Sequence, residues 1–199
     1  MTTALKKEEF ERLMRMGGMV RGSGPKNMAD FILKKKGEQG LEKIEKAIKE
    51  LGHPIDYQEI KPMAFYSMGF AFVTLILSKN FLNFEDKEFQ EMGKLDAQTG
   101  PVRRLFMRFL VSLDMALEEV PSMWRRYHTE GNLRFVEVDK EQGTLILRLE
   151  NFPTIDPHLQ YLIGYFSAIL QMIVGSETSC EVRECENQEK ECYKFLLKW

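Results

Sequence analysis

The feature that most constrains the fold is a change of hydrophobic period at Gly131. Before this residue, apolar residues recur at the three- and four-residue spacing of amphipathic helices, and after it they alternate as in half-buried strands. Residues 133–138 and 144–150 are predicted to pair as a hairpin across a turn at 139–143. Because strands joined by so short a turn are antiparallel, the chain must combine helices with an antiparallel sheet.

The C-terminal part repeats this hairpin after one helix. Asp156 and Pro157 suit the N-cap and first position of a helix, which is predicted to run to about Val174. Residues 178–186 and 191–199 then predict a second hairpin. The fold class is therefore expected to be α+β, with a helical N-terminal half packed on a small antiparallel sheet made of two hairpins joined by a crossover helix.

The N-terminal half is predicted to be mainly helical. Helices are expected at residues 3–16, 26–36, 39–51, 62–79, 86–97 and 101–118, with a break at Gly37 and Gly40 and a short helix restarting at Pro121. A chain of 199 residues has the usual length of one domain. Residues 1–199 are therefore expected to form a single domain, with a helical half at 1–119 and a mixed half at 120–199.

Charge and hydropathy exclude several classes of protein. Lys plus Arg is 28 and Asp plus Glu is 30, so the net charge of -2 gives no basic excess for binding nucleic acid. The longest apolar stretch, residues 64–77, is shorter than the roughly 20 residues of a membrane span. The charged N-terminus lacks the apolar segment of a signal peptide, so a cytoplasmic location is predicted.

Three cysteines, Cys180, Cys185 and Cys192, lie near the C-terminus. An odd count without a signal peptide favours reduced thiols. Cys185 and Cys192 flank the turn of the second predicted hairpin, where the pair could bind zinc together with Glu184, Glu186 or Glu189. A closed zinc site needs four ligands, and the spacing matches no common zinc pattern. No metal site is therefore predicted.

Catalytic motifs are absent from the sequence. It contains no Gly-x-Ser-x-Gly elbow, no His-Glu-x-x-His and no dinucleotide-binding glycine pattern. Most carboxylates alternate with lysines on predicted helix faces, which is typical of a solvated surface. No catalytic residue is predicted, and enzyme activity is not expected.

Large apolar side chains are abundant, with 14 Phe, 12 Met, 6 Tyr and 2 Trp. Those of residues 63–72 surround their predicted helix, so it must be buried on several sides by the core, a partner subunit or a ligand. Methionine adapts to irregular volumes and varied apolar guests. The composition favours either a hydrophobic pocket or a dimer interface.

The order of landmarks in residues 120–199 resembles a known family. The landmarks are Pro121-Ser122-Met123-Trp124-Arg125-Arg126-Tyr127, Gly131, Gly143-Thr144-Leu145-Ile146-Leu147-Arg148-Leu149, Gly164-Tyr165-Phe166, Glu184-Cys185, Cys192 and Trp199. They are similar to the 4-vinyl reductase domain group, and most similar to a full-length branch of uncharacterised bacterial proteins. That group belongs to a superfamily that shares a ligand-binding fold with haem–nitric-oxide sensors and TRAPP vesicle-tethering subunits.

The resemblance implies a domain, frequently dimeric, that holds a small hydrophobic molecule between helices and sheet. Zinc-binding relatives have a Cys on the helix before the last hairpin and a Glu where this chain has Val182, so their zinc site is not expected here. Haem-binding relatives use an axial His and a Tyr-x-Ser-x-Arg contact, and neither is found. The cofactor is therefore left unknown.

Three functions follow, in order of preference. The first is a sensory domain that binds a small hydrophobic or aromatic ligand. The pocket for this ligand would be lined by Phe65, Tyr66, Phe70, Trp124, Tyr127, His128, Tyr161 and Tyr165. For His128 the alternative is an exposed residue at a helix end. The second function is a homodimeric interaction module resembling TRAPP subunits. The third is a reductase of tetrapyrrole vinyl groups, as the family label suggests.

Overall fold

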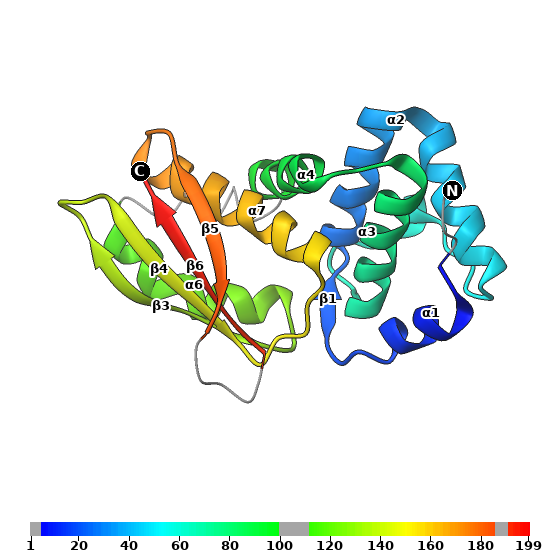
Figure 1. Cartoon of the computed structure of the whole chain (residues 1–199), viewed down its shortest axis with the longest axis horizontal. Coiled ribbons are helices and arrows are strands. Elements are labelled where there is room, and N and C mark those ends of the chain that lie inside the picture. Colours follow the sequence, from blue (N-terminus) through cyan, green and yellow to red (C-terminus); the bar gives the residue numbers. More distant parts are fainter. Residues whose placement is uncertain (1–4, 100–111, 186–190) are drawn as a thin grey trace.

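The computed structural model describes residues 5–99, 112–185 and 191–199. Its elements in chain order are α1 (Lys7–Met14), β1 (Met19–Arg21), α2 (Ser23–Glu50), the 3-10 helix η1 (Tyr57–Glu59), β2 (Phe65–Ser67), α3 (Met68–Leu82), α4 (Asp86–Thr99), α6 (Leu113–Tyr127), β3 (Asn132–Asp139), β4 (Thr144–Glu150), α7 (Asp156–Val174), β5 (Ser179–Glu184) and β6 (Cys192–Lys198). Figure 1 shows the C-terminal sheet with α6 at one end of the molecule and α1, α2 and α3 at the other. The α+β class is confirmed.

The C-terminal sheet has four antiparallel strands in the order β3-β4-β6-β5. Both predicted hairpins are present, and pairing of β4 with β6 joins them into one sheet. In β4 the side chains of Leu145, Leu147 and Leu149 are buried while their neighbours are only partly covered. This alternation places one apolar face of the sheet toward the helices, because successive strand residues point to opposite faces.

The two faces of α7 join the sheet to the N-terminal helices. From the sheet, α7 runs toward α3, with α4 alongside it (Figure 1). The backbones of α4 and α7 approach closely at two glycines. A Cβ at Gly93 would lie 1.9 Å from the carbonyl oxygen of Tyr161, and one at Gly164 would lie 1.9 Å from that of Gln90. Only glycine permits so close an approach of the two helices.

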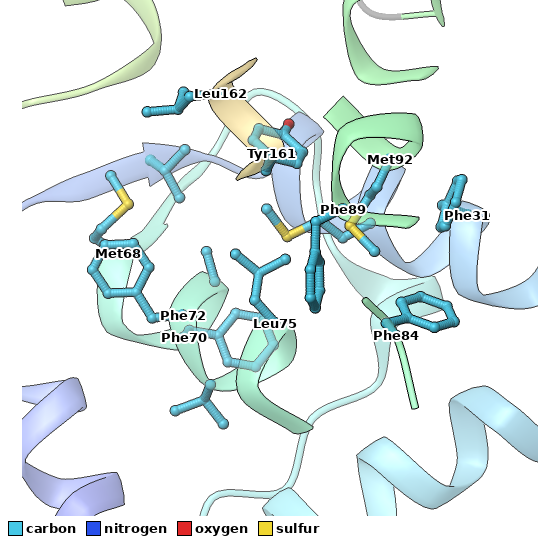
Figure 2. Packing of buried hydrophobic residues seen from close by; sticks show 14 of the residues in the cluster. Phe31, Met68, Phe70, Phe72, Leu75, Phe84, Phe89, Met92, Tyr161 and Leu162 are labelled. Atoms are coloured by element: carbon cyan, nitrogen blue, oxygen red, sulfur yellow. The ribbon is translucent and has the colours of Figure 1, made fainter. Parts of the chain in front are cut away.

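Helix α3 is buried on nearly every side, as predicted for residues 68–72, whereas Met63 lies before the helix and is 67% exposed. Its rings and thioethers form one cluster with residues of α4 and with Tyr161 of α7 (Figure 2). The fully buried side chains include Phe72, Leu75 and Met68. The protein core, rather than a partner, therefore covers this helix. None of the described helices is long and apolar enough to cross a membrane.

Other helices follow the sequence with small changes. Those expected at 3–16, 86–97 and 156–174 are present as α1, α4 and α7, although residues 1–4 lie outside the described residues. The break expected in α2 is confirmed at Gly37, whose φ of 68° and ψ of -175° interrupt the helix, and the helix continues through Gly40.

The expectation at residues 62–67 is wrong. Residues 62–64 form a turn, residues 65–67 form β2 antiparallel to β1, and α3 begins only afterwards. The chain turns tightly after β1 at Gly22, where a Cβ would lie 2.3 Å from the carbonyl oxygen of Lys61. A short apolar run cannot be assigned to helix or strand from its period alone.

The expected restart at Pro121 is also wrong, because α6 runs through this residue without a break. Proline removes one helical hydrogen bond and costs about 3 kcal/mol. Buried residues lie on both sides of it, Leu117 before and Trp124 after, and their packing keeps the helix continuous. The expected helix at 101–118 is described only from residue 113, since residues 100–111 lie outside the described part.

Candidate functional site

A cavity of about 70 Å³ lies between α6, α7 and the inner face of the sheet. Its walls are almost wholly apolar, and none of the described lining residues is Lys, Arg, Asp or Glu. They are Leu113, Ala116, Leu117, Val120, Met123, Trp124, Tyr127, His128, Leu133, Leu145, Leu147, Tyr165, Phe166, Ile169, Leu170, Ile173 and Leu197. We refer to this space as the apolar cavity.

Helix periodicity places these residues on the cavity wall. In α6, lining residues recur at three- and four-residue spacing, and the Ser112 side chain caps the helix by accepting a hydrogen bond from the Met115 amide at 3.4 Å. In α7, Tyr165, Ile169 and Ile173 follow each other at intervals of four and so share one face. The sheet completes the wall with leucines from its inner face.

An aromatic cluster fixes one end of the cavity. The rings of Trp124 and His128 stack with centroids 3.9 Å apart and planes 16° apart. The indole Nε1 of Trp124 donates to the carbonyl oxygen of Glu130 at 3.0 Å. Phe152 packs edge-on against both rings, with its ring centroid 5.0 Å from that of Trp124 and 5.6 Å from that of His128. Neither ring can rotate freely in this arrangement.

The wall of the apolar cavity contains a polar atom without a hydrogen-bond partner among the described residues, Nδ1 of His128. This atom is buried. Burial lowers the pKa of His128 to about 4, and the backbone carbonyl of Trp124 opposes that shift. The imidazole is therefore neutral at pH 7. A buried polar atom without a partner costs about 1–3 kcal/mol, which a ligand that hydrogen-bonds to Nδ1 would recover.

A second cavity of about 40 Å³ lies on the other side of this cluster. Its lining residues come from both halves of the chain: Val20, Arg21, Ser23, Gly24, Met28, Met68, Ala71, Asp96, Trp124, Tyr127, His128, His158, Tyr161, Leu162 and Tyr165. Four of them, Trp124, Tyr127, His128 and Tyr165, also line the apolar cavity. We refer to these four side chains as the partition and to the second space as the Asp96 cavity.

The carboxylate of Asp96 lines the Asp96 cavity. It accepts hydrogen bonds from the Tyr161 hydroxyl and the Asn27 side-chain amide. Burial raises the pKa of Asp96 to about 6, and both hydrogen bonds oppose that rise. Burial, and then the nearby Asp96, also raise the pKa of Tyr161, so its hydroxyl stays protonated.

His158 is neutral as well. Its Nδ1 lies 3.0 Å from the hydroxyl of Thr154. Burial, followed by the proximity of His128, lowers the pKa of His158 to about 3. Neither imidazole therefore supplies a positive charge to the Asp96 cavity at neutral pH.

Five of the eight residues expected to bind a ligand are brought together. The four residues of the partition line both cavities, and Tyr161 lines the Asp96 cavity. The other three, Phe65, Tyr66 and Phe70, line neither space. The guanidinium of Arg21 lies 3.9 Å from the Phe65 ring centroid, the Tyr66 hydroxyl accepts from the Lys61 amide at 3.0 Å, and Phe70 packs on Tyr57 at 5.5 Å.

Sequence reasoning missed several residues of the site. Leu147 and Leu197 enter the wall because the register of the sheet brings their strands side by side. Ile169 and Ile173 lie within the helix predicted to run to about Val174, but they were not predicted to line a cavity. Asp96 lies in a helix rich in charged residues, and nothing in its spacing distinguishes it from an exposed carboxylate. Of these residues, only the isoleucines carried a usable signal, their four-residue spacing from Tyr165.

The prediction of three reduced thiols is wrong for Cys185 and Cys192, which form a disulfide. The hairpin places them opposite each other, with the Cys185 amide donating to the Cys192 carbonyl oxygen at 3.0 Å. Their sulfurs are thus not available as zinc thiolates. Cys180 keeps a free thiol. In the described parts of the chain no three His, Cys, Asp or Glu residues are grouped as a metal site.

Comparison with solved structures identifies the fold. The chain resembles an oxygen-binding H-NOX domain related to soluble guanylate cyclases, in its oxygen complex, with a TM-score of 0.62 and 10% identity over 89% of this chain and 94% of that one. The fold is H-NOX-like. An H-NOX protein from S. oneidensis in the Fe(II)NO state matches with a TM-score of 0.63 and 9% identity, over 89% of this chain and 98% of that one. No family model and no curated protein matches the sequence.

Haem is the cofactor described for the H-NOX family, and the described residues of this chain do not fit it. The apolar cavity of about 70 Å³ has room for a few waters, far less than a porphyrin occupies. None of the described lining residues carries a positive charge to pair with the propionates. His128 is the imidazole in this wall, and its ring lies flat on Trp124.

Proposed function

We propose that this chain is a small-molecule-binding sensory domain whose ligand is a compact, uncharged, apolar molecule held in the apolar cavity. The observation that carries the proposal is an apolar wall with one unsatisfied buried polar atom, Nδ1 of His128. Ligand sites in proteins commonly combine apolar walls with a few placed polar groups. The H-NOX-like fold and the resemblance to the 4-vinyl reductase group support the same reading.

The size of the cavity limits the ligand. An engineered cavity of about 150 Å³ binds benzene, whereas the apolar cavity measures about 70 Å³. A ligand with one aromatic ring therefore requires the cavity to widen. Met123 is the lining side chain best suited to move, because its thioether is unbranched and flexible.

Charge restricts the ligand further. Neutral His128 can accept or donate one hydrogen bond but offers no charge to an anion. A carboxylate would lose its hydration without gaining a partner, which is costly. We therefore expect phenol to bind more tightly than toluene, and benzoate not to bind.

The experiment is calorimetric titration of the purified protein with phenol, toluene and benzoate. Ala116→Phe would place a ring in the cavity and should abolish binding, whereas Met115→Phe, next to it on α6 but 47% exposed, should bind like the wild type. Melting curves of both variants establish that they are folded. Binding of phenol by Ala116→Phe with unchanged affinity would refute the location of the site.

A homodimeric interaction module is the alternative function. The edge strand β3 exposes Phe135 by 40% and Val136 by 49%, and exposed edges pair readily with a second chain. Sedimentation velocity of the wild type and of Phe135→Ser separates the two functions. A dimer that the substitution dissociates would favour the interaction module, and a monomer that binds phenol would favour the sensor.

A further inference from the structure

The hydrogen bonds to Asp96 in the Asp96 cavity are those expected for an ionised carboxylate. Both of its oxygens accept hydrogen bonds, one from the Asn27 amide and one from the Tyr161 hydroxyl. Each donor has its own proton to give, so the carboxylate needs none for these contacts. Every carboxylate oxygen has two lone pairs, and each oxygen of Asp96 therefore retains capacity for one more donor.

No described cation is paired with this carboxylate. Asp96 forms no ion pair with a Lys, Arg or His side chain among the described residues. Arg21 also lines the cavity, but its guanidinium covers the Phe65 ring and donates to the carbonyl oxygens of Arg126 and Met63. Burying a charge without a partner is unfavourable, so a bound cation would stabilise the site.

The remaining walls suit an organic cation. Rings of the partition, of His158 and of Tyr161 surround the space, and the Tyr161 and Tyr165 rings are stacked with centroids 6.3 Å apart. Aromatic faces attract ammonium groups, most strongly when these are desolvated. A carboxylate at one wall and rings around it are thus complementary to an N–H group at one end and methyl groups at the other.

Size and ligand number exclude larger or harder cations. The volume of about 40 Å³ holds roughly three water-sized groups, since each needs ~10–15 Å³. Calcium takes 6–8 oxygen ligands and magnesium an octahedral set, whereas among the described lining residues Asp96 supplies the lone carboxylate. A primary ammonium with one or two carbons needs few acceptors and fits the volume.

We propose that the Asp96 cavity binds a small alkylammonium ion, with Asp96 as its counter-ion and the aromatic rings of the partition as its apolar wall. The Asp96 cavity and the apolar cavity are different spaces that share the partition, and this proposal does not depend on the function proposed for the apolar cavity. Tyr161 and Asn27 act as positioning residues, because they orient the carboxylate and hold it in the charged form.

Calorimetric titration with methylammonium chloride at pH 7.5, with NaCl added to equal ionic strength, tests the proposal. The wild type should give saturable heat, and Asp96→Asn should lower the affinity at least tenfold. Asp30→Asn is the matched control, since Asp30 is exposed on α2, and it should bind like the wild type. Saturable binding that Asp96→Asn leaves unchanged would overturn the proposal, as would heat no larger than that of NaCl.

The pH dependence provides a second test that needs no substitution. Because the pKa of Asp96 is raised to about 6, the carboxylate is mostly charged at pH 7.5 and mostly neutral at pH 5, so affinity should fall about tenfold. Of the other groups facing the cavity, His128 and His158 titrate lower, near 4 and 3, and the pKa values of Tyr161 and Tyr165 are raised. They therefore do not change charge in this range.

Tyr161→Phe separates this proposal from a nonspecific effect if Asp96→Asn does not fold. It retains the ring but removes one hydrogen bond from the carboxylate, so the midpoint of the pH dependence should move upward. A midpoint that stays at the wild-type pH in Tyr161→Phe would contradict the assignment of the titrating group to Asp96.

Discussion

Replacing His128 by phenylalanine is expected to stabilise the ligand-free protein, although it removes a polar group from the proposed site. Phenylalanine preserves the stacking on Trp124 and eliminates the unpartnered Nδ1. The unmade hydrogen bond costs about 1–3 kcal/mol, and the slightly larger ring returns part of that gain as strain. The net stabilisation should be about 1 kcal/mol, or about 2–4 °C in melting temperature for a chain of this length.

The advantage of the variant should grow in acid. Because burial lowers the pKa of His128 from 6.5 to about 4, the unfolded chain binds more protons than the folded one between these values. The stability that neutral His128 contributes is complete above pH 6.5 and is lost as the pH falls to 4, by up to about 3 kcal/mol. Phenylalanine does not titrate, so His128→Phe lacks this loss.

Urea denaturation at pH 7.5, 6, 5 and 4 measures both effects as differences in the free energy of unfolding. His158 is present in both proteins and stays buried, and because burial is the larger cause of its lowered pKa, most of its titration cancels in the difference. His53→Phe, in an exposed loop, is the control for replacing a histidine by phenylalanine outside the cavity. A His128→Phe protein that is less stable at pH 7.5, or whose difference from the wild type is the same at every pH, would refute the reasoning.

Three further predictions concern packing, the site and the disulfide. Gly164→Ala, whose Cβ would lie 1.9 Å from the Gln90 carbonyl oxygen, should lower stability by about 1–3 kcal/mol or more, while Gly17→Ala, with open space around it, should have the same melting temperature as the wild type. Trp124→Ala should lower the free energy of unfolding by about 3–5 kcal/mol and also weaken phenol binding by the protein that remains folded. Calorimetry well below the melting temperature measures that affinity, and an unchanged affinity would make Trp124 a core residue only. Thiol titration of the unfolded protein should find one free thiol, from Cys180, before reduction and three after it, and Cys185→Ser with Cys192→Ser should cost about 2 kcal/mol by chemical denaturation.

The sequence predicted the C-terminal part well because its signals are local. The alternation in residues 144–150 and the turn before it determine a hairpin without knowledge of the rest of the chain, and β4 begins and ends where expected. The strands β1 and β2 were not predicted, since each has three residues and their pairing joins segments more than forty residues apart. A strand that short has no measurable period.

The candidate site was predicted only in part, for a similar reason. Aromatic residues of α6 and α7 could be selected by type, and the structure brings Trp124, Tyr127, His128 and Tyr165 together. Phe65 and Phe70 have the same chemistry but face Arg21 and Tyr57. Which aromatic residues line a space and which fill the core depends on how helices pack, and composition does not report that. Asp96 required knowledge of the α4–α7 contact.

The partition has a consequence for regulation. Because its four side chains belong to both walls, any guest that displaces one of them to enter the first cavity alters the shape offered to a guest in the second. Thermodynamic linkage makes such an effect reciprocal, so the factor by which one guest changes the affinity for the other is the same in both directions. If both proposed ligands bind, this single layer of rings would couple the two cavities, and a guest in one would change the affinity for a guest in the other.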